Sequence, residues 1–320
     1  MTPLRFAVFG KNGLAAARCH ALAACDDTII VKTFSREDIA HYSDDDWDAA
    51  LDTETLDAVV FALEPAIAVS ASISALKKGL HVFSELPGGQ SVEDIVNLRE
   101  AERDSGAILK FGCGLRHHGS VREAQAVIAD GAFGKLLTAR AIYGHAGAPS
   151  GHFANTSILK GHGIQMLDLL HLFCGPFESV KAMSSGQPND EANVFALLRT
   201  ADGAIAQLHS SSTSWRQTFR LELGFERGYV WLDGHLPGLE GYGPEMLIHA
   251  TLSKSERGEP VANPDETIRE FTQHSTAKEE LTEFLDAIAG RAPLGHGNSH
   301  QAFDAINIAE RICAACETWA

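Results

Sequence analysis

The first third of the chain alternates short apolar runs with stretches whose apolar residues recur at helical spacing. Helices are expected over residues 13–25, near 46–51, and over 66–79 and 91–105. The apolar runs between them predict strands, and these runs are LRFAVFG, TIIVKTF, LDAVVFAL, LHVFSEL and AILKFGCG. Strands that alternate with helices form βαβ units around a parallel sheet, and strands this uniformly apolar are buried on both faces. The pattern predicts an N-terminal α/β domain with a doubly wound parallel sheet.

From about residue 119 the pattern changes. One helical stretch, VREAQAVIADGAFG, precedes runs in which apolar and polar residues alternate, among them LLTARAIYGH, SVKAMSS, NVFALLRT, AIAQLHSSST, FRLELGFERGYVWLD and MLIHATLS. Alternation with period two predicts a mostly antiparallel, open sheet with one covered face. The segment GHAGAPSGH, 144–152, is expected to be a surface loop, and the tail from 276 to 319 returns to helical spacing. We therefore expect two domains, residues 1–118 and a C-terminal α/β domain of residues 119–320.

Composition narrows the class of protein. The 320 residues are 45% hydrophobic, which is enough to fill the cores of two ordinary domains. Acidic residues outnumber basic ones, 42 against 26, so the formal net charge of -16 would repel nucleic acid. The first residues lack the features of a signal peptide, and no segment approaches the roughly 20 apolar residues of a membrane span. The sequence predicts a cytoplasmic protein with neither a membrane nor a nucleic-acid partner.

The six cysteines do not suggest a metal site. Four of them stand singly, and Cys313 and Cys316 are the only close pair. Their helical spacing places that pair among apolar residues, and no second CxxC or CxxH accompanies it. We expect buried thiols and no bound metal.

A glycine-containing turn follows the first expected strand. A dinucleotide-binding Rossmann fold requires G-x-G-x-x-G/A there, and the sequence provides Gly10, Asn12 and Ala15. Asn12 places a side chain where the bare backbone would approach a pyrophosphate. The helix that begins near Gly13 can still offer N–H groups to an anion. The turn predicts a dinucleotide site that departs from the usual pattern.

The end of the second expected strand, KTFSRED, bears on the choice between NAD and NADP. A carboxylate at this position binds the ribose 2′-hydroxyl of NAD, whereas Ser35 and Arg36 suit a 2′-phosphate. These two residues favour NADP over NAD. The alternative is a solvated loop in which Arg36 pairs with Glu37 or Asp38.

Two segments resemble signatures of the Gfo/Idh/MocA oxidoreductases, which act on sugars and polyols, and the resemblance extends over nearly the whole chain. GLHVFSELP is similar to the family loop GkhVxxEKP, with matches at Gly79, His81, Val82, Glu85 and Pro87. Leu86 occupies the position of the lysine that family members hold near the nicotinamide. GHGIQMLDLLHLFCG is similar to DxGxHxxDxxxxLxG, with Asp168 matched and Gln165 at the position of the usual proton-carrying histidine.

Further segments extend the resemblance. KFGCGLRHHGSV aligns Arg116 and His118 with the segment that opens the second domain of the family, and RAIYGHAG is like the YGHGG of nucleotide-sugar and acyl-sugar relatives. In VVFALEPAIA, Leu63, Glu64 and Ala68 replace a Thr-Pro and a later histidine. The resemblance implies a cofactor site of Leu63, Glu85, Leu86 and Pro87 with the glycine-turn residues, and a substrate site that includes Arg116, His118, Tyr143, His145 and Lys160.

The chemistry expected of this family needs a group that moves a hydroxyl proton during hydride transfer. Leu86 and Gln165 cannot titrate, although Gln165 can still hydrogen-bond a substrate hydroxyl. His162 could act as the base in its place, because histidine ordinarily titrates near neutral pH; a solvated histidine in a Gly-rich turn is the alternative. Asp168 is either an orienting group or a structurally paired carboxylate, and Glu85 either a site carboxylate or a loop residue.

Three functions remain open from the sequence. The first is an NAD(P)-dependent oxidoreductase that acts on a sugar, polyol or nucleotide sugar with altered catalytic groups. The second is a non-redox enzyme, such as an eliminase, epimerase or glycosidase, that uses a retained cofactor, and the third is a silent sugar or nucleotide sensor or a partner subunit. Because the second-domain sheet presents more apolar surface than one layer of helices covers, we expect a homodimer or homotetramer.

Overall fold

Two sheets organise the computed structural model, one in each of the two units into which the chain divides. The structure describes residues 2–10, 13–39, 42, 44–147, 153, 155–185, 192–234, 243–254, 258–272 and 276–318. The first unit consists of residues 1–114, 149–156 and 275–310, and the second of residues 115–148, 157–274 and 311–320.

The sheet of the first unit is parallel, with the strand order β2-β1-β3-β4-β5. Its strands are β1 (Leu4–Phe9), β2 (Thr28–Phe34), β3 (Ala58–Phe61), β4 (His81–Glu85) and β5 (Leu109–Gly112). The helices are α1 (Gly13–Ala23), α2 (Arg36–Ile39), α3 (Asp44–Ala50), α4 (Pro65–Lys77), α5 (Val92–Ser105), α8 (Thr276–Ile288) and the first part of α9 (Ser299–Ala315). The order reverses between β1 and β3, and in such sheets ligands bind beyond the carboxyl ends of the strands at the reversal. The predicted doubly wound parallel sheet is confirmed.

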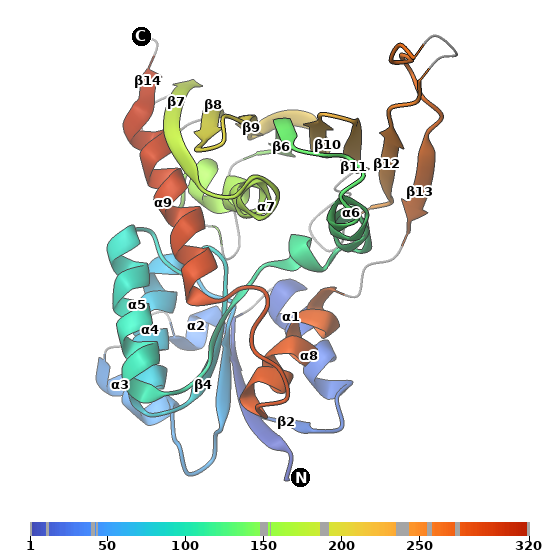
Figure 1. Ribbon diagram of the computed structural model, residues 1–320. Coiled ribbons are helices and arrows are strands. Elements are labelled where there is room, and N and C mark those ends of the chain that lie inside the picture. The colour runs from blue at the N-terminus through green and yellow to red at the C-terminus, as the bar shows by residue number, and fades with distance from the viewer. Residues whose placement is uncertain are drawn as a thin grey trace. The chain divides into compact units, whose positions relative to one another are not determined.

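Helices cover both faces of this sheet: α4 and α5 lie on one face, and α1 and α8 on the other (Figure 1). The apolar side of α8 brings Phe284 against Phe6 and Phe83, with ring centroids 6.5 and 5.7 Å apart. This packing explains why residues 275–310 belong to the first unit. The sequence places them in the second domain, because chain position alone does not reveal which sheet a helix covers.

The expectation that every strand of this sheet is buried on both faces fails at one edge. Strands β3 and β5 are buried throughout, and β4 is buried except for a half-buried first residue. Strand β2 is the edge strand, so Ile29 and Val31 are about half exposed. At its end, Phe34 lies beside Phe9 in register, and the two rings stack at 4.4 Å.

The sheet of the second unit is mostly antiparallel, with the order β13-β12-β11-β10-β6-β9-β8-β7-β14. Its strands are β6 (Leu136–Ala146), β7 (Phe177–Ser185), β8 (Asn193–Thr200), β9 (Ile205–Ser211), β10 (Thr213–Phe225), β11 (Gly228–Gly234), β12 (Glu245–Thr251), β13 (Thr267–Phe271) and β14 (Cys316–Thr318). Among the described strands of this sheet, only β6 with β9 and β7 with β14 pair in parallel. The predicted mostly antiparallel sheet is confirmed. Gly144, His145 and Ala146 end strand β6 rather than opening a loop, and 148–152 lie outside the described residues.

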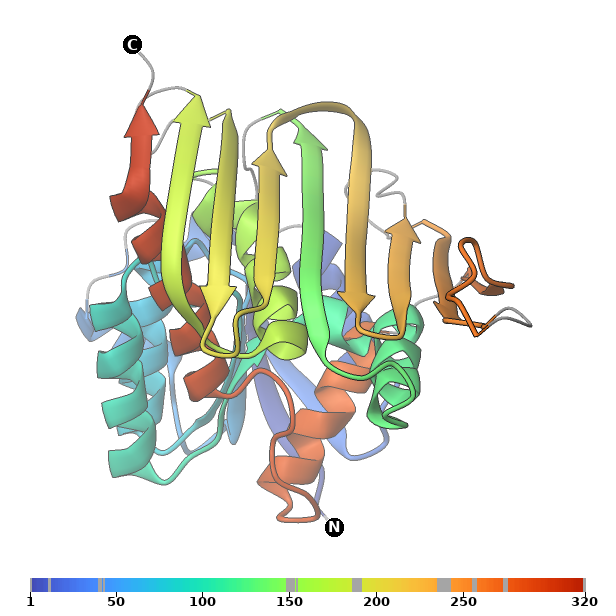
Figure 2. The ribbon, with the colours of Figure 1, turned by 45° about the horizontal axis from the view of Figure 1, so that its top comes forward.

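One face of this sheet is covered and the other is open, as the alternating pattern predicts. Helices α6 (Gly119–Ala129) and α7 (Ile164–Cys174) lie behind the strands in Figure 2. Apolar side chains on the strands that are more than a third exposed are Leu137, Met183, Phe195, Leu197, Ile205, Trp215, Trp231, Met246 and Ile268.

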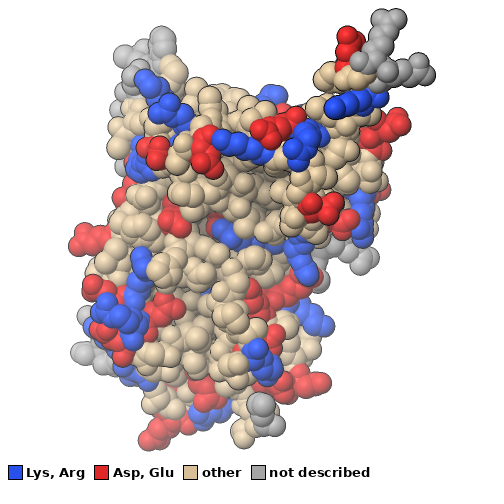
Figure 3. Space-filling model, viewed as in Figure 1, with Lys and Arg blue, Asp and Glu red and all other residues tan. Residues whose placement is uncertain are grey.

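The surface agrees with the charge balance of the sequence. Lys and Arg are interspersed with Asp and Glu over the face drawn in Figure 3, rather than gathered into an extended basic surface there. Among the described helices, none is long and apolar enough to cross a membrane. The structure describes all six cysteines, and none of them forms a disulfide.

Candidate active site

The turn after β1 in the first unit fits the backbone of a dinucleotide-binding turn. Gly10 has a φ of +142°, and a Cβ there would lie 2.6 Å from the carbonyl oxygen of Ala62. Only glycine fits, because its φ lies in the region that favours glycine and the turn passes close to the backbone that follows β3. Helix α1 begins at Gly13 with its first N–H groups unused by the helix, and Ala15 is buried in the core as a small residue should be. Asn12 lies outside the described residues.

The end of β2 contains the residues expected to select the cofactor. The backbone N–H of Ser35 donates to Asp38 Oδ2 at 2.7 Å, and the N–H of Asp38 donates to Ser35 Oγ at 3.3 Å. Asp38 therefore holds the turn. Arg36 begins the short helix α2, and its side chain lies outside the described part of the chain.

Apolar side chains follow the next two strands. Leu63 after β3 and Leu86 after β4 are both buried, and Pro87 follows Leu86 through a cis peptide bond. Glu64 begins the α4 turn, and its Oε2 accepts a hydrogen bond from Asn155 at 2.7 Å. With the Gly10 turn and the start of α1, this edge of the sheet has the shape and the N–H groups to hold a dinucleotide, and it offers no titratable group at position 86.

Glu85, the last residue of β4, is a partner in a buried ionic cluster. Arg18 of α1 donates from Nε to Glu85 Oε1 at 2.7 Å and pairs through Nη2 with Glu280 Oε2 of α8, also at 2.7 Å. The second oxygen of Glu280 accepts the N–H of Cys113 at 2.6 Å. Burial raises the pKa of Glu85, although the adjacent Arg18 favours its charged form.

A π-helical turn, η3 (Leu159–Gly163), leads directly into α7 in the second unit. The sequence KGHG is therefore helical rather than the solvated turn of the alternative interpretation. Gly163 allows η3 to pack closely on β9, since a Cβ there would lie 2.7 Å from Ser210 Oγ. Turns of this type are rare and are frequently found at functional sites.

The π-helical turn places His162 against His145 of β6. The two rings stack with centroids 3.9 Å apart and planes inclined by 17°. Tyr143, two residues before His145 and on the same face of the strand, meets the His145 ring edge-on at 4.8 Å. Three residues that the sequence selects from separate segments thus form one cluster, which we call the histidine cluster: Tyr143, His145 and His162.

His145 is the polar group of this cluster whose environment is most unusual. Burial lowers its pKa to about 4, so the ring is neutral at pH 7. Its Nε2 is buried and makes no hydrogen bond. A buried ring nitrogen without a partner costs free energy that a ligand hydroxyl could recover. Lys160, on the same turn, is half-buried, and its backbone N–H donates to Ser157 Oγ at 3.2 Å.

Asp168 and Arg116 bind each other rather than solvent. Arg116 of the 3₁₀ turn η1 (Gly114–His117) donates from Nε to Asp168 Oδ2 at 2.6 Å and from Nη2 to Oδ1 at 2.7 Å. Both side chains are buried. Of the two roles that the sequence allows for Asp168, an orienting group or a structurally paired carboxylate, the structure shows the second. Arg116 does not present its guanidinium to a substrate, because that group is held by Asp168. Gln165, one turn earlier on α7, is half-buried.

His118 is also placed in the interior, contrary to the substrate-binding role expected of it. Its Nδ1 lies 2.5 Å from Glu245 Oε1 of β12, and Ser120 donates to the other oxygen of that carboxylate. The imidazole, the hydroxyl and the carboxylate are all buried. This cluster fixes the start of α6 against the sheet.

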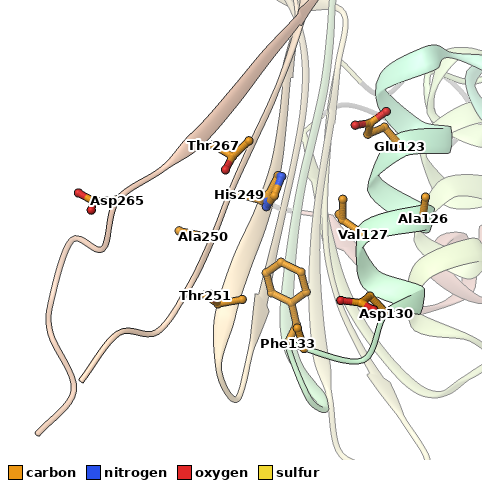
Figure 4. Close-up of a pocket in the computed structure, with 11 residues that line it drawn as sticks. Glu123, Ala126, Val127, Asp130, Phe133, His249, Ala250, Thr251, Asp265 and Thr267 are labelled. Carbon is orange, nitrogen blue, oxygen red and sulfur yellow. The ribbon is translucent and has the colours of Figure 1, made fainter. Parts of the chain in front are cut away.

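A separate cavity of about 550 Å³ lies in the second unit between α6 and strands β12 and β13 (Figure 4). Phe133 and His249 form its inner wall, and Glu123, Asp130 and Asp265 stand around it. Glu123 accepts a hydrogen bond from Arg269 at 2.6 Å. None of the residues that the sequence selects lines this cavity, and its acidic side chains would repel a phosphorylated or nucleotide ligand.

The sequence contains a signal for two buried charged residues, Arg18 and Glu280, that the predicted site does not include. Arg18 stands three residues after Ala15 and four before Leu22 in α1, and both of those residues are buried. Helical spacing therefore directs Arg18 into the core, where an arginine requires carboxylate partners. Glu280 shares this signal, since Leu281 and Phe284 beside it are buried.

Comparison with known protein families identifies one segment of the chain. Residues 121–231 match the model of the GFO/IDH/MocA C-terminal domain, and this range contains the whole histidine cluster. No curated protein sequence matches the chain. The expected resemblance to the Gfo/Idh/MocA oxidoreductases is confirmed by this domain and by the solved structures that share the fold.

Two of those structures illustrate the match. KijD10, a 3-ketoreductase from Actinomadura kijaniata in complex with NADP and TDP-benzene, is 19% identical with a TM-score of 0.81, over 99% of both chains. GnnA, a UDP-N-acetylglucosamine 3-dehydrogenase from Acidithiobacillus ferrooxidans, is 18% identical with a TM-score of 0.78, over 99% of this chain and 98% of that one. At this identity the likeness establishes the fold.

Proposed function

We propose that this chain, whose second unit carries a GFO/IDH/MocA C-terminal domain and whose fold is that of the Gfo/Idh/MocA oxidoreductases, is an NADP-dependent oxidoreductase acting on a hydroxyl carbon of a sugar or nucleotide sugar. The observation that carries the proposal is the stacking of His162, which lies on a π-helical turn, against His145 of β6. That pair supplies a titratable group within the matched domain although Leu86 and Gln165 replace the expected ones.

Residues of the first unit would hold the dinucleotide. The Gly10 turn and the first N–H groups of α1 suit a pyrophosphate, and Ser35 and Arg36 stand where a 2′-phosphate is selected. KijD10, which has the same fold, holds NADP. When bound, the nicotinamide accepts a hydride from a hydroxyl carbon or returns it to a carbonyl carbon.

Residues of the histidine cluster would handle the proton. Oxidation of a secondary alcohol to a ketone transfers a hydride from carbon and releases the hydroxyl proton, and in our proposal His162 takes that proton. His145 remains neutral because burial lowers its pKa to about 4. A neutral aromatic ring stacked on an imidazolium stabilises the cation through its π face. Gln165 contributes a hydrogen bond to the substrate without carrying a proton.

Two carboxylates expected at the site receive structural roles in this proposal. Glu85 and Asp168 are each buried against an arginine, with both oxygens in hydrogen bonds. Because a guanidinium engages both oxygens of each carboxylate and both groups are shielded from solvent, neither carboxylate is placed to exchange a proton with a substrate. The proton-handling groups of this chain therefore differ from those that the family signatures suggest.

We also propose that the chain acts as a homodimer or homotetramer through the open face of the second sheet. Exposed apolar residues lie on neighbouring strands of that face, for example Phe195 and Leu197 on β8 and Ile205 on β9. Charged pairs cross the middle of the face, Arg140 with Glu222 and Arg220 with Asp233. A cytoplasmic setting completes the proposal, in keeping with six cysteines that form no disulfide.

A fluorescence titration with NADPH and NADH, followed by a turnover assay, tests the proposed function. We expect NADPH to bind more tightly than NADH, and NADP to be reduced when a nucleotide sugar such as UDP-N-acetylglucosamine is added. Absence of binding for both dinucleotides would remove the oxidoreductase proposal. Binding without turnover across aldoses, inositols and nucleotide sugars would favour the silent sensor instead.

A further inference from the structure

Ser210 of β9 lies on the same face of the second sheet as the histidine cluster. It pairs directly with Tyr143 of β6 in the parallel register of the two strands. Residues that pair directly in a sheet point to the same face, and His145 follows Tyr143 by two residues on that face. The turn η3 and helix α7 pack against both strands there, and Ser210 is fully buried. Ser210 therefore lies between the sheet and the segment that carries His162.

The hydroxyl of Ser210 and the turn η3 share one backbone group, the carbonyl oxygen of Ile158. The N–H of Gly163 donates to this oxygen at 2.9 Å, and the bond spans five residues, which is the π-helical spacing. Ser210 Oγ donates to the same oxygen in a longer hydrogen bond of 3.4 Å. A carbonyl oxygen has two lone pairs and can accept both bonds. The carbonyl group that defines the π-helical turn is thus held from within η3 and also from β9.

Gly163 lets the turn approach Ser210 closely. A Cβ at position 163 would lie 2.7 Å from Ser210 Oγ and 3.2 Å from the carbonyl oxygen of Ile158. A side chain there would therefore push η3 away from β9 or displace the serine. The missing side chain of the glycine and the small hydroxyl of the serine together set the distance between the turn and the strand.

The hydrogen-bond register of the turn decides where His162 points. In an α-helical turn the N–H of Gly163 would bond to the carbonyl of Leu159 instead, and a shift of one residue is a rotation of about 100° around the helix axis. Such a rotation would turn the ring of His162 away from His145, on which it now stacks at 3.9 Å. The stack therefore requires contacts that hold the π-helical register, and Ser210 supplies one of them from outside the helix.

We infer that Ser210 is a positioning residue for His162: its hydroxyl, packed against Gly163, holds the π-helical turn in the register that stacks His162 on His145. For its effect on the reaction this inference rests on the proposed function, because His162 is the proposed base. Ser210 takes no part in the proton transfer itself, since its hydroxyl is buried and bonded to a backbone carbonyl. Its contribution is the orientation of the imidazole, and a misplacement of about 1 Å can lower a rate by about 10²-fold.

Ser210→Ala is the direct test, made in the full-length protein with its histidines isotopically labelled for NMR. In the unmutated protein, nuclear Overhauser contacts should connect the ring protons of His145 and His162, and His162→Gln identifies the signals. In Ser210→Ala these contacts should be lost. The kcat for NADP reduction with UDP-N-acetylglucosamine should fall by about 10- to 100-fold in this variant. The Kd for NADPH should stay the same, because the residues proposed to hold the dinucleotide lie in the first unit.

Gly163→Ala gives a second variant that acts on the same contact. Its methyl group meets Ser210 Oγ at 2.7 Å, so this variant should also separate the two imidazole rings and lower kcat. In the double variant Gly163→Ala with Ser210→Ala, the oxygen that the methyl group meets is gone. The combined loss of kcat should therefore be smaller than the product of the two single losses. Losses that simply multiply would show that the two residues act independently and would overturn the inference.

Ser211 supplies a matched control on the same strand. It is also buried, and its hydroxyl contacts Thr213, but as the next residue of β9 it points to the opposite face of the sheet. Ser211→Ala should leave the Overhauser contacts and kcat unchanged. Equal effects of Ser211→Ala and Ser210→Ala would overturn the inference, as would Overhauser contacts that persist in Ser210→Ala.

The NMR comparison separates this inference from the proposed function. If the unmutated protein binds neither dinucleotide, the proposed function fails, and the loss of the Overhauser contacts in Ser210→Ala would still show that Ser210 positions His162. If NADP is reduced and Ser210→Ala changes neither kcat nor the contacts, the inference fails while the proposed function stands.

Discussion

The guanidinium of Arg18 holds both carboxylate oxygens of Glu85, with Nε to Oε1 at 2.7 Å and Nη2 to Oε2 at 3.1 Å. Arg18 also lies over the ring of Phe83, with Cζ 4.4 Å from the ring centroid. The pair connects the helix that follows the glycine turn to the strand that ends at Leu86. The two segments expected to hold the cofactor are therefore joined through the interior of the first unit.

Removal of this arginine should be strongly destabilising. In Arg18→Met, Glu85 and Glu280 remain buried near each other without a cation, and breaking a buried pair in this way costs about 3–5 kcal/mol. Urea denaturation gives the free energy of unfolding. Glu85→Gln should cost less, because burial already raises the pKa of Glu85 and the amide keeps the shape of the carboxyl group.

The control for this prediction is a pair at the surface of the same unit. Arg291 donates to Asp286 at 2.6 Å, and both side chains are about half or one-third exposed. Arg291→Met should change the free energy of unfolding by less than about 1 kcal/mol. Equal costs for the two substitutions would mean that Arg18 does not act as a buried ion-pair partner.

The depressed pKa of His145 predicts a specific dependence of stability on pH. Its pKa falls from 6.5 to about 4 on folding, so the unfolded chain binds more protons between these values and stability is lost as the pH falls from about 6.5 towards 4. Between pH 7 and pH 5 the loss attributable to this group is about 2 kcal/mol. His145→Phe should remove that part of the pH dependence. Denaturation curves at the two pH values measure it, and an unchanged slope in the variant would assign the effect to other groups.

Cofactor choice should depend on Arg36. The residue stands directly after the end of β2, where a cation selects a 2′-phosphate, so Arg36→Ala should abolish any preference for NADPH over NADH. The control is Lys32→Ala, which removes a cation from the same strand; Lys32 lies over the ring of Phe34 at 4.4 Å. Retention of the preference in Arg36→Ala, or its loss in Lys32→Ala, would show that Arg36 does not select the cofactor.

Charge introduced on the open sheet face should dissociate the oligomer. Leu197→Glu combined with Ile205→Glu places two carboxylates on neighbouring strands of that face, and like charges brought together across a two-fold interface repel. Light scattering should give an oligomeric mass for the unmutated protein and a monomeric mass for the variant. A single control substitution at an exposed apolar position outside this sheet, Val96→Glu on α5, should leave the mass unchanged. A monomeric mass for the unmutated protein would contradict the proposed assembly.

The strands of both sheets could be predicted because their residues satisfy local rules. Runs such as AVVF are apolar throughout, whereas FRLELGF alternates apolar and other residues, so each segment itself indicates burial on two faces or on one. Strand β13, with the sequence TIREF, carries no such pattern since all but its last residue are exposed. Strand β14 could not be predicted from the sequence, because its three residues directly follow a helix.

The candidate site could be predicted only in part. The sequence selects Tyr143, His145 and His162, but that they meet depends on the π-helical turn, whose extra residue leaves no periodic signature. Arg116 and Asp168 are 52 residues apart, and their pairing follows from tertiary packing alone. From the sequence alone, an Asp or an Arg is equally compatible with a substrate contact and with a buried ion pair. Only the burial of the side chain in the structure distinguishes the two roles.

The position of the proton-carrying group provides the most direct test of the mechanism. If His162 takes the hydroxyl proton, His162→Gln should lower kcat by about 10²- to 10⁴-fold while the affinity for NADPH is unchanged. The double variant His162→Gln with Gln165→His moves the imidazole three residues along, to the start of α7, where neighbouring turns share one side of the helix. We expect this double variant to recover part of the lost rate. The control is His171, a half-buried histidine on the last turn of α7, and His171→Gln should leave kcat unaffected.

Introducing a lysine at position 86 would not test the proton-carrying group in the way that the histidine exchange does. Leu86 is 2% exposed, so Leu86→Lys would bury an ammonium group and reduce stability before any effect on chemistry could be measured. The histidine exchange avoids this problem, because Gln165 is already polar and half-buried. Full activity in His162→Gln would place the proton transfer on another group, and the pH–rate profile of that variant would then distinguish a titrating side chain from a water molecule.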